Sequence, residues 1–326
     1  MKTSHSLIWA LVAMWLGWLV TLLVSSATVL SLFSQAIIYA IFALGVGLLL
    51  KQNGMVSFGH ALYFGGAAYG VGILLQQQLM PPEWVILVVL LSVFVAALLI
   101  GLVIVRVPGV AFGMLTLAIG QMFYLSASRA RGITGGADGM NIDWPSQMFG
   151  QSVSQWLKPA SLFGLTWCVL VLLVWALGRL MNTRFGAITE AVRDNEERAR
   201  FIGLNTLWPR ALIYALSALV TAVAGVLSAF NTGFVSPENL HWSLSGVALM
   251  MVVVGGFKAL WGPAVGAVIY FLFKDLLGEH ATHWMTIFGL ALIAVIVFSP
   301  TGIAGWITRM ADRVRQATQA HRGVES

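Results

Sequence analysis

The stretch RLMNTRFGAITEAVRDNEERARFIGLNTLWPR, residues Arg179 to Arg210, lies between long apolar runs and holds ten of the chain's 18 basic and 12 acidic side chains. We call it the charged segment. Charged side chains are costly at the depth of the hydrocarbon core, so a segment of this composition lies in water beside a membrane. Its surface position predicts contact with a soluble partner.

The composition outside the charged segment is that of an integral membrane protein. The 326 residues are 59% hydrophobic and 9% charged, with a mean hydropathy of +0.88, whereas soluble domains carry roughly 25% charged residues. The net charge of +6 does not indicate nucleic acid, because Lys and Arg gather beside apolar runs, where they orient helices. The single cysteine, Cys168, excludes an intrachain disulfide and is expected in the core.

The apolar runs predict an all-α polytopic membrane protein with about ten transmembrane helices, some of them broken or short. The third run is rich in glycine and is expected to be broken or closely packed. Residues 1–27 imitate a secretory signal, but their apolar part exceeds the usual ~7–15 residues, so we expect a retained helix. The expected spans are about residues 7–24, 29–50, 52–79, 84–105, 110–128, 161–178, 211–230, 242–256, 261–277 and 284–299.

Basic residues predict how these spans are oriented. The charged segment contains six arginines, and four more follow in the tail 309–326, so both are expected in the cytoplasm. The transmembrane domain is then residues 1–308, with both termini cytoplasmic. The loop 129–158 is expected on the periplasmic side, although it contains Arg129, Arg131 and Lys158.

Two short sequences suggest an internal repeat. Asn53-Gly54-Met55-Val56-Ser57 is similar to Thr232-Gly233-Phe234-Val235-Ser236, and each follows one apolar run and precedes another. The predicted topology places them on opposite sides of the membrane. Such an arrangement is typical of the inverted repeats of transporters.

The charged segment itself has the periodicity of a short helix. Ala187, Ile188, Ala191 and Val192 recur at helical spacing, opposite acidic and basic residues. Along the polar face, Glu190 can pair with Arg193, and Asp194 with Arg198. Two interpretations fit this pattern: a loop helix whose charges keep it solvated, or an element that docks onto a cytoplasmic subunit.

Polar residues inside apolar spans are the candidates for a translocation pathway. The alternative is that they only bond neighbouring helices or, for Ser and Thr, their own helix backbone. The candidates are Gln35, Ser57, His60, Thr116, Gln121 and Asn231. His60 has no second histidine at ligand spacing, and His280 with His283 falls short of the three or four ligands of a zinc site, so we predict no metal.

Several glycines and one proline indicate close helix packing or a broken helix. Glycine lets backbones approach each other, and proline removes a backbone donor. A broken helix would instead expose backbone groups to the pathway. The residues concerned are Gly59, Gly255, Gly256, Gly262 and Pro263.

The run Ala191-Val192-Arg193-Asp194-Asn195-Glu196-Glu197-Arg198-Ala199, followed by Gly203 and Asn205, resembles the cytoplasmic segment of permeases from the branched-chain amino acid ABC importers. Further blocks are similar to that family in the same order, among them Ser57-Phe58-Gly59-His60-Ala61, Thr134-Gly135-Gly136, Val235-Ser236-Pro237 and Trp261-Gly262-Pro263. Ala67, Ala111, Gly113 and Lys258 depart from the family pattern, where Gly, Tyr, Ala and Gly are expected. These departures put the substrate in doubt more than the fold.

The resemblance implies a permease subunit in the bacterial inner membrane that imports branched-chain amino acids by alternating access. It implies a homologous second permease, two cytoplasmic ATPases and a periplasmic binding protein as partners. The charged segment would couple to the ATPases, with Gly203 ending its helix and Glu190, Arg193, Asn195, Glu196 and Arg198 as contacts. The sequence has no G-x-x-x-x-G-K-[ST] motif, so we expect no enzyme activity and no cofactor here, with ATP and Mg²⁺ on the partner ATPases.

Other functions remain open at this point. The same machinery serves urea, short amides or other small carboxylates in systems similar to these. An autonomous secondary transporter would place a coupling charge within its spans, whereas the acidic residues here cluster in loops or near span ends. An intramembrane enzyme would need a nucleophile with a base or a metal, which Cys168 and the scattered histidines do not supply.

Overall fold

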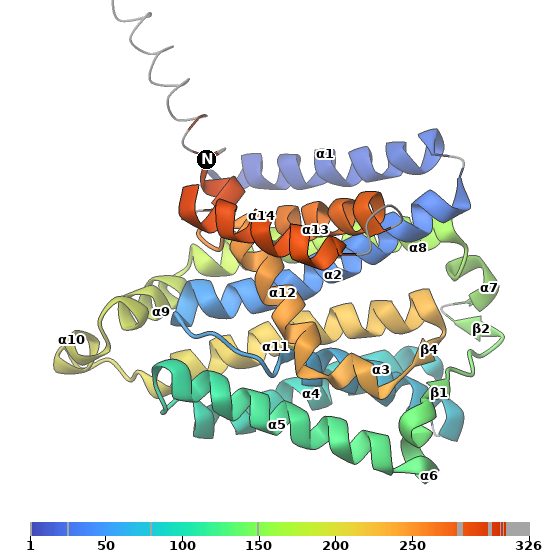
Figure 1. The fold of residues 1–326 in the computed structure, drawn as a ribbon, viewed down its shortest axis with the longest axis horizontal. Coiled ribbons are helices and arrows are strands. Elements are labelled where there is room, and N and C mark those ends of the chain that lie inside the picture. The colour runs from blue at the N-terminus through green and yellow to red at the C-terminus, as the bar shows by residue number, and fades with distance from the viewer. Residues whose placement is uncertain are drawn as a thin grey trace, which may run out of the picture.

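The computed structural model describes residues 2–24, 26–78, 80–148, 150–278, 283–298, 302–306, 308 and 310. Within these residues, ten helices of 14 residues or more form a bundle (Figure 1). They are α1 (Lys2–Leu23), α2 (Ala27–Asn53), α3 (His60–Gln77), α4 (Pro82–Ile104), α5 (Gly109–Arg129), α8 (Pro159–Met181), α11 (Leu207–Thr232), α12 (Trp242–Gly255), α13 (Gly262–Gly278) and α14 (Trp284–Phe298).

These helices correspond one by one to the predicted spans, so the expectation of an all-α polytopic membrane protein is confirmed. Five of them, α2, α4, α5, α8 and α11, are long and apolar enough to cross a bilayer by length and composition. The first predicted span is helix α1, which the indole of Trp167 in α8 holds by donating a hydrogen bond to the Ala13 carbonyl at 2.8 Å.

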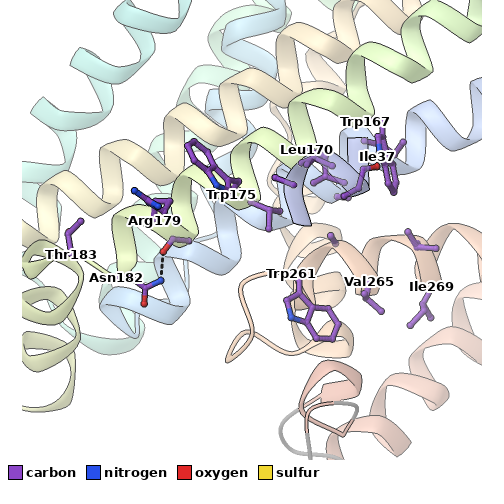
Figure 2. A pocket seen from close by; sticks show the side chains of 18 residues that line it. Ile37, Trp167, Leu170, Trp175, Arg179, Asn182, Thr183, Trp261, Val265 and Ile269 are labelled. Carbon is purple, nitrogen blue, oxygen red and sulfur yellow. Dashed lines mark hydrogen bonds between the residues drawn. The ribbon is translucent and has the colours of Figure 1, made fainter. Parts of the chain in front are cut away.

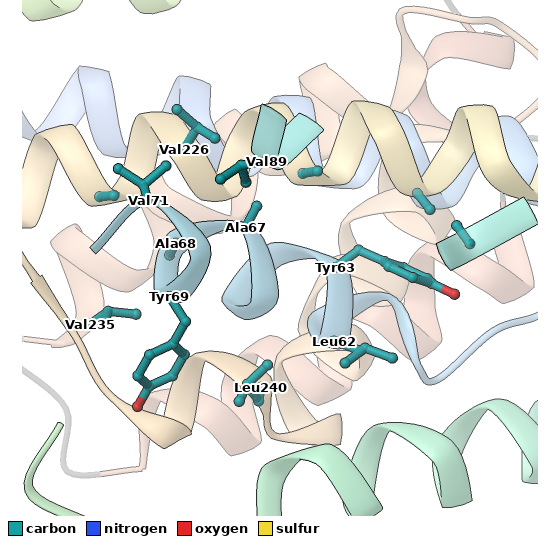
Figure 3. Packing of buried hydrophobic residues seen from close by; sticks show 14 of the residues in the cluster. Leu62, Tyr63, Ala67, Ala68, Tyr69, Val71, Val89, Val226, Val235 and Leu240 are labelled. Carbon is teal, nitrogen blue, oxygen red and sulfur yellow. The ribbon is translucent and has the colours of Figure 1, made fainter. Parts of the chain in front are cut away.

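The centre of the bundle is the antiparallel pair α2 and α11, drawn blue and yellow in Figure 1. Small residues let the two backbones approach closely: a Cβ atom at Gly45 would lie 2.7 Å from the Ser217 carbonyl oxygen. Gly225 meets the carbonyl of Phe64 in α3 in the same way. Figure 3 shows Val226 of α11 and Val89 of α4 together on one side of α3 and Leu240 on the other.

The glycine-rich third span begins later than predicted. A helix was expected from about residue 52, but Gln52 and Asn53 belong to α2 and α3 starts at His60. The chain breaks because Gly54 adopts the left-handed conformation, with φ 66°, and donates its N–H to the Leu50 carbonyl. Met55, Ser57 and Gly59 of the connection are buried, with Ser57 fully inaccessible.

The matching sequence after α11 has the same local structure. Gly233 is also left-handed, with φ 63°, and donates its N–H to the Ala229 carbonyl. The carboxyl-terminal ends of α2 and α11 lie at opposite ends of the bundle (Figure 1). The two similar sequences therefore have the arrangement that an inverted repeat predicts.

Helix α12 runs obliquely across the bundle and stops where glycines meet (Figure 1). It ends at Gly255, the next residue Gly256 has φ 92°, and α13 begins at Gly262. Cβ atoms at Gly262 and Gly266 would collide with the carbonyls of Gly256 and Met251. The helix thus ends here, and the two backbones pack closely against each other; Pro263 lies against Gly47 of α2.

Short helices and strands lie at the two ends of the bundle. One end carries α9 (Arg184–Asp194) and α10 (Glu196–Phe201), and the other carries most of residues 129–158 (Figure 1). The latter elements are α6 (Arg131–Thr134), η1 (Gly136–Asp138), β1 (Met140–Asn141), β2 (Gln147–Met148), β3 (Gln151–Ser152) and α7 (Val153–Trp156), followed after α11 by β4 (Phe234–Val235) and η2 (Pro237–Leu240). Strand β1 pairs antiparallel with β4, and β2 with β3.

The predicted core position of Cys168 is wrong, because this residue lies on the exposed side of α8.

The glycine contacts between α12 and α13 generate a prediction. Replacing Gly266 with Ala puts a methyl group against the Met251 carbonyl, and overpacking of this kind costs about 1–3 kcal/mol. The thermal unfolding midpoint of the detergent-purified chain should fall. Gly246→Ala, in α12, meets no atom within 4 Å and should leave the midpoint unchanged; equal midpoints for both variants would contradict the packing role.

Candidate functional site

The charged segment projects from one end of the bundle as two short helices, α9 and α10 (Figure 1). The part of the charged segment that lies outside the long helices is slightly shorter than predicted. Arg179 lies in the last turn of α8, which ends at Met181, and Arg210 lies in the first turn of α11, which starts at Leu207. The segment is thus attached to α8 and α11 at its two ends.

The buried face of α9 differs from the predicted one. Ala187 and Ala191 are exposed, while Gly186, Thr189 and Val192 are buried. The hydroxyl of Thr189 donates to the side-chain oxygen of Gln52 in α2 at 2.7 Å. Gly186 packs on the carbonyl of Met181. Contacts with α2 and α8 therefore select this face, rather than the apolar pattern of the helix.

Arg193 joins the charged segment to the end of α2. Its Nη1 donates to the carbonyl oxygen of Lys51 at 2.6 Å, and its side chain covers Gly54. Its guanidinium also pairs with Asp194 at 2.6 Å and with Glu190 at 3.5 Å. The predicted Glu190–Arg193 pair is confirmed, whereas Asp194 pairs with Arg193 instead of Arg198. Arg193 therefore lies where α2 leads into the connection to α3, residues 54–59.

Asn195 and Glu196 hold the charged segment together. Asn195 caps α10, its side-chain oxygen accepting the Arg198 N–H at 2.8 Å. The Glu196 carboxylate pairs with Arg200 at 2.6 Å and with Arg210 of α11, and it accepts a hydrogen bond from the Thr206 hydroxyl at 3.1 Å.

The environment of Glu196 favours its charged form. Partial burial would raise the pKa of this carboxyl, but Arg210, the Thr206 hydroxyl and Arg200 together lower it below its usual value. A carboxyl with a lowered pKa adds stability above its unfolded pKa, and this contribution is lost as the pH falls through the folded pKa. The link between α10 and α11 is therefore strongest near neutral pH.

The tip of the charged segment presents apolar side chains that sequence reasoning missed. Phe201 and Ile202 are 89% and 71% exposed, among the exposed charges of Glu197 and Arg198. Gly203 has φ 82° and follows two residues after the end of α10 at Phe201. The signal was present, since two large apolar residues stand in the most charged part of the chain.

Three of the predicted pathway residues meet beneath the start of α3. His60 is fully buried, with Nδ1 2.8 Å from the Ser57 hydroxyl and Nε2 2.9 Å from the hydroxyl of Ser217 in α11. The Thr116 hydroxyl accepts the Phe58 N–H at 3.2 Å. We call Ser57, His60, Thr116 and Ser217 the buried polar cluster. Its groups are satisfied by one another and by the backbone, as in helix packing.

The other predicted pathway residues lie apart from the buried polar cluster. Gln35 lines a groove on the outside of the bundle. Gln121 is half-buried on α5, and its side-chain oxygen is buried without a hydrogen-bond partner. Asn231 lies in the last turn of α11. Gly59 precedes α3, where a Cβ atom would collide with the Thr116 carbonyl, so its role is close packing.

No group of three metal-ligating side chains is found among the residues that the structure describes. His280 lies outside those residues, so the pair that it forms with His283 in the sequence has no structural description.

The ion pairs of Glu196 generate a prediction. Glu196→Gln leaves Arg200 and Arg210 without their carboxylate, and hydrogen bonds to charged groups contribute ~1.5–3 kcal/mol. Hydrogen exchange of residues 195–206 should speed up at neutral pH. Exchange of the unmodified chain, corrected for intrinsic rates, should approach the variant's as the pH falls. Glu197→Gln, at an exposed neighbour, is the control; a pH-independent difference would count against the assignment.

The sequence is similar to a family of known membrane permeases. The family model described as branched-chain amino acid transport system / permease component matches residues 28–298. The high-affinity branched-chain amino acid transport system permease protein LivM of Escherichia coli K12 is 24% identical over 301 residues, covering 86% of this chain and 71% of LivM. The fructose import permease protein FruF of Bifidobacterium longum is 27% identical over 308 residues, 89% of this chain and 82% of FruF.

A shorter similarity links residues of this chain to the autoinducer 2 import system permease protein LsrC of Escherichia coli O9:H4, 29% identical over 175 residues, 49% of this chain and 51% of LsrC. No solved structure matches the chain. Because the family model covers most of the sequence, from α2 to α14, this chain belongs to the family of branched-chain amino acid transport system permeases.

Proposed function

We propose that this chain is the permease subunit of an ATP-driven importer of branched-chain amino acids in the bacterial inner membrane, with its charged segment and both termini in the cytoplasm. The observation that carries the proposal is the structure of the charged segment, which is anchored at its base and exposed at its tip. Its base is fastened to α2 and α11, and its tip offers Phe201 and Ile202 to the solvent.

The partners are a homologous second permease, two cytoplasmic ATPases that hold ATP and Mg²⁺, and a periplasmic binding protein. Exposed aromatic and aliphatic side chains in water fit a pocket on a protein partner, because their burial is the main source of binding energy at interfaces. Glu197 and Arg198 surround this tip and would form the polar rim of the contact with an ATPase.

Movement of the ATPase reaches the membrane helices through two connections. Arg193 bonds the last turn of α2, and Glu196 bonds Arg210 in the first turn of α11. A rigid displacement of the charged segment therefore acts on both central helices at the same end of the bundle. Alternating access needs such an element, because nucleotide must bias the outward-open and inward-open states differently.

The substrate is the finer part of the proposal. The family description and the relative LivM are named for branched-chain amino acids, while FruF and LsrC are named for fructose and autoinducer 2. Selectivity in such a system would reside largely in the separate binding protein. Urea, short amides or other small carboxylates carried by the same machinery are the second candidates.

Arg193 provides the direct test of coupling. Arg193→Glu removes the bond to the Lys51 carbonyl and sets a third acid beside Glu190 and Asp194. Uptake of labelled leucine by cells should fall by at least about tenfold, the effect of losing a single charged hydrogen bond, while membrane insertion persists. Arg184→Glu, an exposed reversal in the same helix, is the control. Normal uptake by inserted Arg193→Glu would refute the coupling role.

The apolar tip provides a separate test of docking. The double variant Phe201→Ser and Ile202→Ser should release the ATPase from the purified complex, reducing recovery roughly thirtyfold if the tip is a hot spot of ~2 kcal/mol. Folding should be unaffected, because both side chains are exposed. Phe234→Ser removes a 40% exposed ring at the opposite end of the bundle. Recovery of the ATPase that matches this control would show that the tip does not dock.

A further inference from the structure

A long apolar groove lies on the outside of the bundle, away from the buried polar cluster. Figure 2 shows its two walls: Trp167 and Leu170 of α8 lie opposite Val265 and Ile269 of α13, and Trp175 lies farther along α8. Small residues of α1 and α2 complete it, and its volume is about 1220 Å³. An apolar furrow between membrane helices is filled by hydrocarbon or by another helix, because water is absent at that depth.

The groove continues along the bundle into a second cavity of about 720 Å³. The two share Ile37, Trp167 and Val268, so they form one furrow. The second part ends at Lys274 and Asp275 near the end of α13. The furrow therefore runs along much of the length of α8 and α13, and it has the extended shape of an acyl chain rather than of a compact solute.

The end of the groove that is formed by the first residues of the charged segment is polar and basic. Arg179, Asn182 and Thr183 gather there (Figure 2). The Arg179 guanidinium lies 5.8 Å from the centre of the Trp175 ring, and among the described residues it forms no ion pair with a carboxylate. The indole nitrogen of Trp175 is buried without a hydrogen-bond partner.

We propose that this groove binds an anionic phospholipid, with its phosphate on Arg179 and its acyl chains between α8 and α13. A guanidinium binds phosphate oxygens through two parallel hydrogen bonds, and a cation beside a membrane helix attracts anionic headgroups. Trp175 and Trp261 stand near the basic end of the groove, as tryptophans do at membrane interfaces. Arg179, which pairs with no carboxylate among the described residues, lies at the end of an apolar groove. This arrangement is complementary to a phosphate group attached to acyl chains.

The occupied groove would brace α8 against α13. The lipid headgroup lies at the end of α8, on the residue with which the charged segment begins. This site is independent of the transported substrate, and its test does not require transport.

The experiment measures lipid retention by the full chain, purified in mild detergent with the subunits that accompany it. Dioleoylphosphatidylglycerol and dioleoylphosphatidylcholine are added in equal amounts, and bound lipid is counted by native mass spectrometry. The unmodified chain should retain the anionic lipid preferentially. Arg179→Glu should lower its retention roughly fivefold, the factor that one juxtamembrane cation contributes.

Two further variants separate the headgroup from the groove. Val265→Trp fills the furrow and should reduce retention of both lipids, with an unchanged unfolding midpoint showing that the chain still folds. Arg184→Glu reverses an exposed charge outside the groove lining and should retain lipid normally. Equal retention of the two lipids by the unmodified chain, or equal loss in Arg184→Glu and Arg179→Glu, would overturn the proposal.

A second protein chain in the groove would also overturn it. Val265→Cys in the Cys168→Ser background places one thiol on the groove wall. In membranes, a photoreactive phosphatidylglycerol should then cross-link to the groove wall at this thiol. A cross-link to another permease subunit in place of the lipid would show that the groove is a protein interface.

Discussion

The close approach of α2 and α11 is the contact on which the rest of the structure depends. Within a bilayer, lipid tails are as apolar as leucine, so helices associate through close packing and hydrogen bonds rather than through the hydrophobic effect. Gly45 meets the Ser217 carbonyl, and Gly225 meets α3 at the Phe64 carbonyl. These contacts bring Ser217 within reach of His60. A larger side chain at either glycine would separate the helices and leave buried polar groups without partners.

The residues of the charged segment fall into two sets, those that bond inside the protein and those that are exposed. Arg193, Asn195 and Glu196 make their hydrogen bonds inside the protein, to Lys51, to the start of α10 and to Arg210. Glu197, Arg198, Phe201 and Ile202 remain exposed. One set of residues attaches the segment to the central helices, and the other set remains exposed to solvent. A single block of sequence thus contains two structurally different groups of residues.

The sequence could predict the spans well, because the thickness of the hydrocarbon imposes their length and composition. It could not locate the start of α3, since this depends on the left-handed Gly54 and on the non-helical residues that follow it. The buried face of α9 was also out of reach, because Thr189 meets Gln52, a residue 137 positions away. Polarity alone could not separate Gln35, on the outer groove, from His60, in the core.

The buried polar cluster constrains how this bundle can change shape. Sliding α3 along α11 by one helical turn, ~5.4 Å, would break the bond between His60 and Ser217 and leave the Nε2 of the buried His60 without this partner. Tilting the two helices about that point would keep the bond intact. A change of shape that preserves this bond would therefore be a tilt about His60, with the largest displacements at the far ends of the two helices.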